Sequence, residues 1–183
     1  MTKSKFNLQK GTYHFEDLAL NHSRIVDFWE REETYEMVEG DKNKNVLRAA
    51  SNANYMLLGF DDDDTLIGSS GNDWLEAGLG DDLMIFNGGR DLMVGMPGAD
   101  TFIIDLAKLS TKDTAYIADF KDVGDNIQFV NVDPHLNMDI GIDNSIMIHA
   151  NLGSGERGVV AVLGGMEGNE TFAVGHNSIQ LVA

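Results

Sequence analysis

An aspartate recurs every nine residues through the middle of the chain, and this period constrains the fold more than any other feature of the sequence. The spacing holds without exception over five positions, Asp64, Asp73, Asp82, Asp91 and Asp100. A short fixed period is typical of repeat architectures, in which each unit stacks on its neighbours. We therefore expect this segment to fold as a stack of short, equivalent units.

Two other columns of residues keep the same phase as the aspartates. An apolar residue follows each aspartate by two positions, at Leu66, Leu75, Met84, Met93 and Phe102. A glycine precedes four of the five by two positions, at Gly71, Gly80, Gly89 and Gly98. One unit cannot bury its single apolar side chain, whereas stacked units build an apolar column and a ladder of backbone hydrogen bonds. The sequence thus predicts glycine-containing turns that alternate with short strands.

The acidic charge of the chain gathers on the same segment. The 183 residues carry a formal net charge of −17, and residues 59–104 hold ten acidic residues against one basic residue, Arg90. Stacked carboxylates repel one another, and a hard dication such as Ca²⁺, which accepts six to eight oxygens, relieves that repulsion. So acidic a chain disfavours nucleic acid as a partner. The absence of cysteine excludes disulfides, thiolate zinc sites and a catalytic thiol.

Residues 59–103 resemble the RTX nonapeptide repeat, G-G-x-G-x-D-x-U-x. The resemblance implies an all-β fold, a right-handed parallel β-roll (a β-solenoid) in which two consecutive units form one coil. It implies that all five repeat aspartates bind Ca²⁺, with Asp64, Asp82 and Asp100 on one side of the roll and Asp73 and Asp91 on the other. About three ions or more are expected from this pairing. Further candidate ligands are the turn carbonyls at Gly71, Gly80, Gly89 and Gly98, and the side chain of Asp62.

The flanks are expected to close the two ends of the roll. We place an N-terminal flank or cap at residues 1–45, the roll at 46–105 and a capping segment at 106–183. Residues 12–40 have charged faces that favour a partly helical cap, and the Asn-containing units at 45–47 and 54–56 favour coils that bind no calcium. The C-terminal part is rich in short alternating segments, which predict a β-rich cap: IMIHA, GVVAVL, ETFAV and SIQLV.

The stretch after the repeats resembles the segment that follows them in RTX proteins. Its matching residues are Ile117, Asp119, Phe120, Asp125 and Ile127. Asp119 and Asp125 are candidates for a further calcium site, and ordinary surface acids near turns explain them equally well. Strands are expected around Tyr116–Phe120 and Ile127–Phe129.

The sequence carries none of the catalytic motifs that often accompany such repeats. H-E-x-x-H and G-x-S-x-G are absent and the five histidines lie far apart, so we expect the chain not to be an enzyme. Its longest apolar stretches are too short to span a membrane, and residues 1–20 do not form a secretory signal peptide. The resemblance implies instead an extracellular protein exported by the type I secretion machinery through an uncleaved C-terminal signal, with which the ending NSIQLVA is compatible.

Two functional readings follow from the resemblance. The first is a calcium-binding roll that folds on binding extracellular Ca²⁺ after export. The alternative is a polysaccharide-binding module similar to the repeat modules of alginate epimerases, which engage acidic sugars. The chain is also compatible with a fragment of a larger RTX adhesin or toxin.

Overall fold

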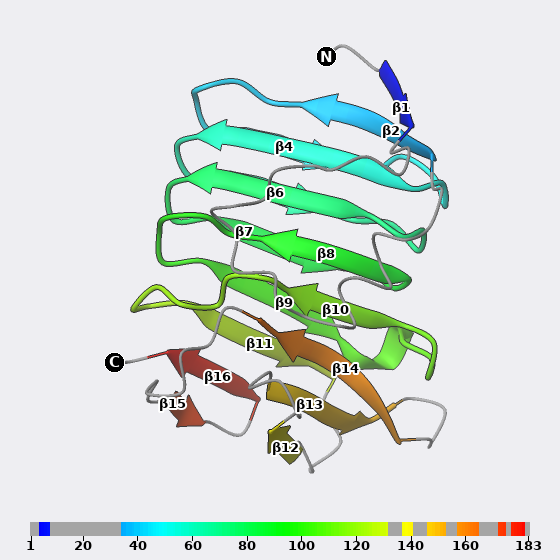
Figure 1. The fold of residues 1–183 in the computed structure, drawn as a ribbon, viewed down its shortest axis with the longest axis vertical. Coiled ribbons are helices and arrows are strands. Elements are labelled where there is room, and N and C mark those ends of the chain that lie inside the picture. Colours follow the sequence, from blue (N-terminus) through cyan, green and yellow to red (C-terminus); the bar gives the residue numbers. More distant parts are fainter. Residues whose placement is uncertain are drawn as a thin grey trace.

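Two β-sheets face each other across a shared apolar core in the computed structural model of the chain (Figure 1). The structure describes residues 4–7, 34–131, 137–140, 146–152, 157–164, 172–174 and 177–181. No helix within these ranges is long and apolar enough to cross a membrane. The predicted all-β parallel roll is confirmed.

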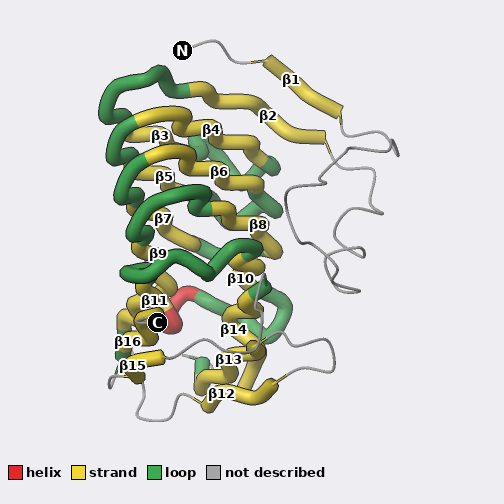
Figure 2. The backbone as a smooth tube through the Cα atoms, turned by 60° about the vertical axis from the view of Figure 1, so that its left-hand side comes forward, coloured by secondary structure: helices red, strands yellow, loops and turns green. Residues whose placement is uncertain are grey.

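From β2 to β11, successive strands alternate between the two sheets, so that each coil contributes one strand to each sheet (Figure 2). Sheet A contains, in spatial order, β1 (Ser4–Asn7), β2 (Thr34–Glu39), β4 (Tyr55–Asp61), β6 (Trp74–Leu79), β8 (Arg90–Val94), β10 (Thr114–Ile117), β14 (Arg157–Leu163), β13 (Ile146–Asn151) and β12 (Asn137–Ile140). Sheet B contains β15 (Phe172–Val174), β16 (Ser178–Leu181), β11 (Asn126–Val130), β9 (Thr101–Asp105), β7 (Leu83–Phe86), β5 (Thr65–Ile67) and β3 (Val46–Arg48).

The register of the strands shows that two nine-residue units make one coil. In sheet B, Leu66 pairs with Met84 and Met84 pairs with Phe102, each pair eighteen positions apart. In sheet A, Leu75 pairs with Met93 at the same offset. Because side chains alternate between the two faces of a strand, this register points the whole apolar column into the space between the sheets. All five side chains are fully buried there, as the repeat predicted.

Parallel pairing continues beyond the last repeat. Strand β10 pairs with β8, and β11 pairs with β9. The offsets are longer than eighteen, with Met93 opposite Ile117 and Phe102 opposite Ile127. All but one of the extra residues lie between β9 and β10, and the other lies between β10 and β11. The longer insertion includes the short 3-10 helix η1 (Leu106–Lys108), which is capped where the Asp105 carboxylate accepts a hydrogen bond from the Ala107 N–H. The segment that follows the repeats therefore first adds one more coil to the roll.

Antiparallel strands end both sheets at the C-terminal side. Strand β13 pairs antiparallel with β14 and with β12, and β16 pairs antiparallel with β11 and with β15. These strands match the short alternating segments from which a β-rich cap was expected. A cap of this kind pairs edge groups that a stack of parallel strands leaves open.

The N-terminal side of sheet A is also closed by strands. The expected helical character over residues 12–40 is wrong for residues 34–39, which form β2; residues 12–33 lie outside the described ranges. Strand β2 pairs parallel with β4, with hydrogen bonds from the Glu36 N–H to the Asn54 carbonyl and from the Gly40 N–H to the Leu58 carbonyl, both 2.8 Å. The backbone hydrogen bonds offered by the edge of β4 outweigh the weak helical preference of these residues.

Shortening one side chain of the apolar column should destabilise the roll strongly. Leu75→Ala removes a fully buried side chain and leaves a cavity, so we expect a loss of about 2–5 kcal/mol in the free energy of unfolding. Leu79→Ala in the same strand is the matched control, because Leu79 is 53% exposed, and its effect should stay within about 0.5 kcal/mol. Urea denaturation in millimolar calcium measures both. Equal losses would contradict the proposed core.

Candidate metal centre

The five repeat aspartates lie where the turns enter the strands, and all five are buried. Each stands two residues before an inward-facing apolar side chain, and residues two apart on a strand share a face. The aspartates therefore point inward as well. Asp73 and Asp91 have no exposed surface, and Asp64, Asp82 and Asp100 have at most 2%. Aspartate is almost never so buried without partners, so its contacts carry information about function.

One carboxylate oxygen of each aspartate accepts a backbone hydrogen bond from the preceding coil. On one side of the roll, the Asp64 N–H donates to Asp82 Oδ1 at 2.6 Å, and the Asp82 N–H donates to Asp100 Oδ1 at 3.0 Å. On the other side, the Asp73 N–H donates to Asp91 Oδ1 at 2.9 Å. These two ladders group the aspartates as expected, with three on one side of the roll and two on the other.

Both ladders extend beyond the repeats. Asn45 stands one coil before Asp64 and donates its N–H to Asp64 Oδ1 at 2.6 Å, and Tyr55 does the same for Asp73 at 2.7 Å. At the other end, the Asp100 N–H donates to Asp125 Oδ1 at 3.0 Å. The expected upstream coils therefore exist, with a neutral residue at each aspartate position.

The structure also brings Asp119 to the end of the ladder that contains Asp100. The Asp119 carboxylate accepts the N–H groups of Gly95 at 2.9 Å and Met96 at 2.8 Å, in the turn that leads to Asp100. Asp119 and Asp125 are both buried. They are built into the last coil and are not ordinary surface acids, and both oxygens of each carboxylate accept backbone N–H groups. A further calcium site at these two residues stays a prediction.

The second carboxylate oxygen distinguishes the aspartates from one another. Asp73 Oδ2 accepts the Ser69 N–H at 2.5 Å, and Asp125 Oδ2 accepts two N–H groups from its own turn. The buried Oδ2 atoms of Asp64, Asp82 and Asp91 have no hydrogen-bond partner. A buried carboxylate oxygen without a donor is costly. A cation is the partner that would satisfy it.

Other oxygen atoms converge on these carboxylates at two glycines. A Cβ atom built on Gly68 would lie 3.1 Å from Asp91 Oδ2, 3.2 Å from Asp73 Oδ2 and 3.5 Å from the Ile85 carbonyl oxygen. A Cβ atom on Gly59 would collide with Asp64 Oδ2 and with the Ala77 carbonyl oxygen. Each glycine therefore leaves a space lined by oxygens from two successive coils. Carboxylate and carbonyl oxygens in a loose arrangement are the ligands that Ca²⁺ accepts.

Side-chain carboxylates alone do not make these sites. Within the described ranges, no three His, Cys, Asp or Glu side chains gather as a metal-binding group. The arrangement instead combines a carboxylate from each of two coils with carbonyl oxygens of the turns. Sites of this composition suit a cation that takes many neutral oxygens, which again favours Ca²⁺ over metals that need nitrogen or sulfur ligands.

The predicted turn glycines stack directly on one another. A Cβ atom on Gly89 would collide with the Gly71 carbonyl oxygen, and one on Gly98 with the Gly80 carbonyl oxygen. Gly80 and Gly89 also have φ angles of +141° and +84°, in the region that favours glycine. These glycines are thus required by the close approach of adjacent turns. The Gly89 carbonyl itself accepts a hydrogen bond from the Thr114 N–H at 2.8 Å.

Two residues that break the repeat pattern point away from the carboxylate columns. Asp62 is exposed, has a φ of +73°, and accepts the N–H of Asp63 at 2.9 Å, so it caps its own turn. Arg90 directs its guanidinium to Tyr116, donating to the hydroxyl at 3.1 Å with its carbon 5.7 Å from the ring centroid. The arginine next to Asp91 therefore does not take the place of a cation beside that carboxylate.

A second ladder, which the sequence analysis missed, runs beside the aspartates. At four positions, an Asn or Asp side chain accepts a hydrogen bond from the backbone N–H eighteen residues later: the Asn72 N–H donates to Asn54 Oδ1 at 2.8 Å, and the Asp81 N–H to Asp63 Oδ1 at 3.0 Å. Asn72 and Asp81 repeat this contact with the next coil. The signal was present in the sequence, because Asn or Asp recurs every nine residues at 54, 63, 72 and 81.

Burial and mutual repulsion raise the pKa values of the stacked carboxyls. Burial raises the pKa of Asp91 well above the usual 3.8, and the nearby charge of Asp73 adds to the effect. Burial, together with the charges of Asp125 and Asp82, raises the pKa of Asp100 to about 8. The pKa values of Asp82 and Asp125 rise to about 6, again mainly through burial. The protein alone therefore does not stabilise these groups as carboxylates.

Residues 58–93 match the family model of the RTX calcium-binding nonapeptide repeat, in four copies. A search of curated proteins finds no match to the chain. The repeat block is an RTX calcium-binding repeat, folded as a parallel β-roll.

Without calcium, the roll should be more stable in mild acid than at neutral pH. The carboxyl pKa values are higher in the folded roll than in the unfolded chain, so the folded state binds more protons. This contribution is fully present below the unfolded value of 3.8 and is lost as the pH rises through about 6 and then about 8. Far-ultraviolet circular dichroism of the calcium-stripped chain at about pH 5 and about pH 8 measures it. Equal or greater β content at the higher pH would contradict the expectation.

Proposed function

We propose that this chain is a calcium-dependent roll in which Asp64, Asp73, Asp82, Asp91 and Asp100 supply side-chain ligands and calcium binding is coupled to folding. The observation that supports it best is the set of buried Oδ2 atoms of Asp64, Asp82 and Asp91, which have no hydrogen-bond partner. The other carboxylate oxygen of each of these three aspartates, Oδ1, already accepts a hydrogen bond from a backbone N–H. The columns are thus organised for a cation that the protein itself does not provide.

Two spaces are the best candidates for individual ions. The first lies at Gly68, between Asp73, Asp91 and the Ile85 carbonyl, and the second at Gly59, between Asp64 and the Ala77 carbonyl. Asp82, Asp100, Asp119 and Asp125 continue the second column toward the C-terminal end. When bound, calcium supplies the positive charge that the ten acidic residues of 59–104 lack.

The same electrostatics support coupled folding. Without a cation, folding must bury stacked carboxylates whose desolvation and repulsion oppose it, as the raised pKa values of Asp91 and Asp100 indicate. Metal binding to the folded state alone adds its free energy to folding. Extracellular calcium modules have dissociation constants of about 10⁻⁴–10⁻³ M. A roll in that range stays unfolded in the cytosol and folds outside, which fits export by the type I secretion machinery.

We assign the roll a binding and structural role, not a catalytic one. The repeat aspartates that cluster in it are engaged in the hydrogen-bond ladders. An acidic polysaccharide partner would need a basic or a calcium-bearing face on the repeat block. Its one basic residue, Arg90, contacts Tyr116, so we place calcium binding ahead of that alternative.

Removing one inward carboxylate should weaken calcium binding. Asp82→Asn keeps a hydrogen-bond acceptor for the Asp64 N–H but removes the charge, and we expect a loss of about tenfold or more in the affinity of the sites beside it. The midpoint of calcium-induced folding should move to correspondingly higher calcium. Isothermal titration calorimetry and circular dichroism measure the two effects.

Asp81→Asn is the matched control for this substitution. Asp81 adjoins Asp82, is exposed, and accepts the Ala99 N–H through Oδ1, which an asparagine amide oxygen can also do. It changes the net charge equally but leaves the inward column intact, so its calcium affinity should stay close to that of the unmodified chain. If the two variants lose affinity equally, bulk charge and not the buried column governs binding.

A further inference from the structure

Three residues at equivalent positions of successive coils have a left-handed backbone. Phe60, Gly78 and Met96 are spaced by eighteen positions, and their φ angles are +87°, +118° and +70°. Glycine adopts this conformation without steric cost, whereas a bulky residue there is an outlier. Gly78 has to be glycine, because a Cβ atom on it would collide with the Phe60 carbonyl oxygen. The roll therefore imposes the left-handed conformation at this position, and Phe60 and Met96 occupy it at a cost.

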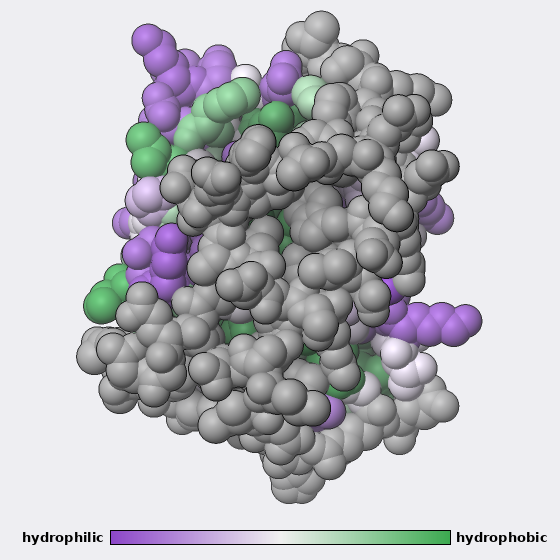
Figure 3. All heavy atoms as spheres, viewed as in Figure 1, coloured by the Kyte–Doolittle hydropathy of each residue, from purple (hydrophilic) through white to green (hydrophobic). Residues whose placement is uncertain are grey.

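Burial does not offset this cost at Phe60. Its side chain is 48% exposed, and Leu79 in the next coil is 53% exposed. The register pairs Phe60 with Gly78 and Asp61 with Leu79, so the two exposed apolar residues are diagonal neighbours. In the space-filling view, described hydrophobic residues reach the surface on the margin where β4 and β6 end, between hydrophilic ones (Figure 3). An exposed apolar side chain on a strained backbone indicates a role at the surface.

A notch opens at Gly78, between the bulky residues of the coil before it and the coil after it. It has a volume of about 220 Å³ and lies where β4 and β6 end. Its apolar walls are Leu58, Phe60, Leu79 and Met96. Because a cavity of about 150 Å³ holds one benzene ring, this notch is large enough for one long side chain. Its shape thus depends on a glycine that stands between two bulky residues.

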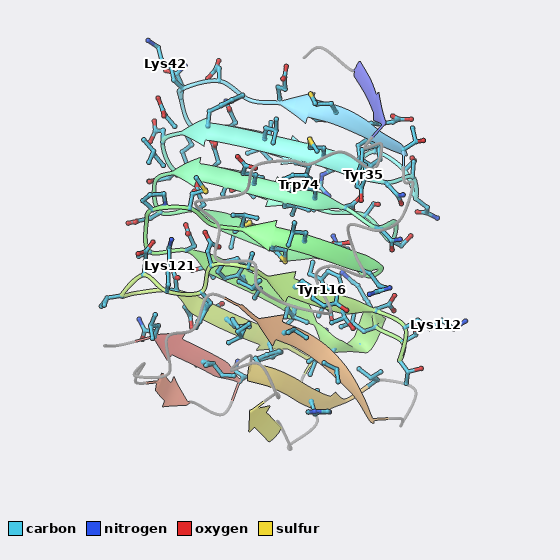
Figure 4. All side chains as sticks on the ribbon, viewed as in Figure 1. Tyr35, Lys42, Trp74, Lys112, Tyr116 and Lys121 are labelled. Carbon is cyan, nitrogen blue, oxygen red and sulfur yellow. The ribbon has the colours of Figure 1, made fainter. Side chains whose placement is uncertain are left out.

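Two carboxylates accompany the apolar walls of the notch. Asp61, which is exposed, and Glu76, which is half-buried, both line it. The negative charge of Asp119 also acts on Glu76. None of the described residues that line the notch is basic. In Figure 4, Lys42 and Lys121 lie on the same margin of the roll, one above and one below the ends of β4 and β6. The notch therefore presents negative charge beside apolar surface.

Arginine is the side chain whose chemistry matches both parts of the notch. Its methylene groups pack on apolar surface while the charged head reaches carboxylates. Its planar guanidinium stacks on aromatic rings such as that of Phe60 and pairs with carboxylates such as those of Asp61 and Glu76. A second copy of the chain is disfavoured as the occupant, because each copy carries a formal net charge of −17 and the copies repel each other.

We propose that the notch at Gly78 binds an arginine side chain of a partner polypeptide. Phe60, Leu79 and Met96 contact the methylene groups and the guanidinium plane, and Glu76 and Asp61 provide the opposite charge. This binding site goes beyond calcium binding, because it gives the folded roll a protein partner of stated chemistry. It also explains why bulky residues occupy Phe60 and Met96, where the backbone favours glycine.

Nuclear magnetic resonance titration of the full, calcium-loaded, ¹⁵N-labelled chain tests the site. The probe is the peptide acetyl-Gly-Gly-Arg-Gly-Gly-amide, and we expect it to shift the amide signals of Phe60, Gly78 and Leu79 in a saturable way. The same peptide with citrulline in place of arginine has a similar shape but no charge, and it should bind about tenfold more weakly. Equal binding of the two peptides, or shifts spread over the exposed acids without saturation at the notch, would overturn the proposal.

Variants separate the notch from the bulk charge of the chain. Phe60→Gly keeps every charge and suits the left-handed backbone, so it should fold in calcium at least as stably and bind the arginine peptide about fivefold more weakly. Leu79→Ala removes a second wall and should also weaken binding. Glu76→Gln should weaken it as well, whereas Asp81→Asn, which removes one charge outside the notch, should not. Unchanged binding in the folded Phe60→Gly and Leu79→Ala variants, or equal losses in Glu76→Gln and Asp81→Asn, would contradict the assignment.

Two further measurements distinguish other causes. Circular dichroism of each variant in millimolar calcium shows whether the roll has folded, so that a failure of calcium-dependent folding is not mistaken for a failure of the notch. Dilution of the unmodified chain without peptide should leave the amide signals of Phe60 and Leu79 in place. If these signals move with protein concentration, the notch binds a second copy and the proposal is wrong.

Discussion

The hydrogen bond from a backbone N–H to an aspartate one coil further along is the interaction on which the rest of the roll depends. It fixes the spacing of successive turns, because Asp64, Asp82 and Asp100 each serve as both donor and acceptor in one column. The same bond takes each carboxylate out of water. A side chain that stays charged at neutral pH in solution is thereby held where its charge is unfavourable.

The apolar column and the carboxylate column both result from the alternation of side chains between the two faces of each strand. Each aspartate and the apolar residue two positions later share the inner face of a strand, so burying Leu66 or Leu75 also buries Asp64 or Asp73. The hydrophobic gain cannot be separated from the electrostatic cost within this sequence. In the proposed function, a calcium ion bound to the carboxylate column would offset this electrostatic cost, so that the dication would control folding.

Much of this could be predicted from the sequence, because a strict period determines which residues share a face and a side of the roll. The two aspartate groups and the buried column from Leu66 to Phe102 follow from it directly. The C-terminal strands follow from a different signal, the short alternating segments near the end of the chain. The longer last coil could not be predicted, because the insertion at Leu106–Lys108 interrupts the period. Strand β2 was missed for a different reason. Its strand conformation depends on pairing with β4, and the intrinsic secondary-structure preference of its own residues carries no information about that pairing. The ladder that contains Asn54 and Asn72 has its own nine-residue spacing of Asn and Asp in the sequence. It was not predicted, because the neighbouring aspartate repeat is the stronger pattern.

The coupling of calcium binding to folding is the central claim, and far-ultraviolet circular dichroism of one sample under three conditions tests it most directly. At neutral pH, the spectrum is recorded with calcium removed by a chelator, with calcium restored to millimolar excess, and with magnesium at the same excess. The account predicts a largely disordered spectrum without calcium, a β-sheet spectrum with it, and little recovery with magnesium, which requires a stricter octahedral geometry and retains its waters. An identical β-sheet spectrum in the chelator and in calcium would contradict it.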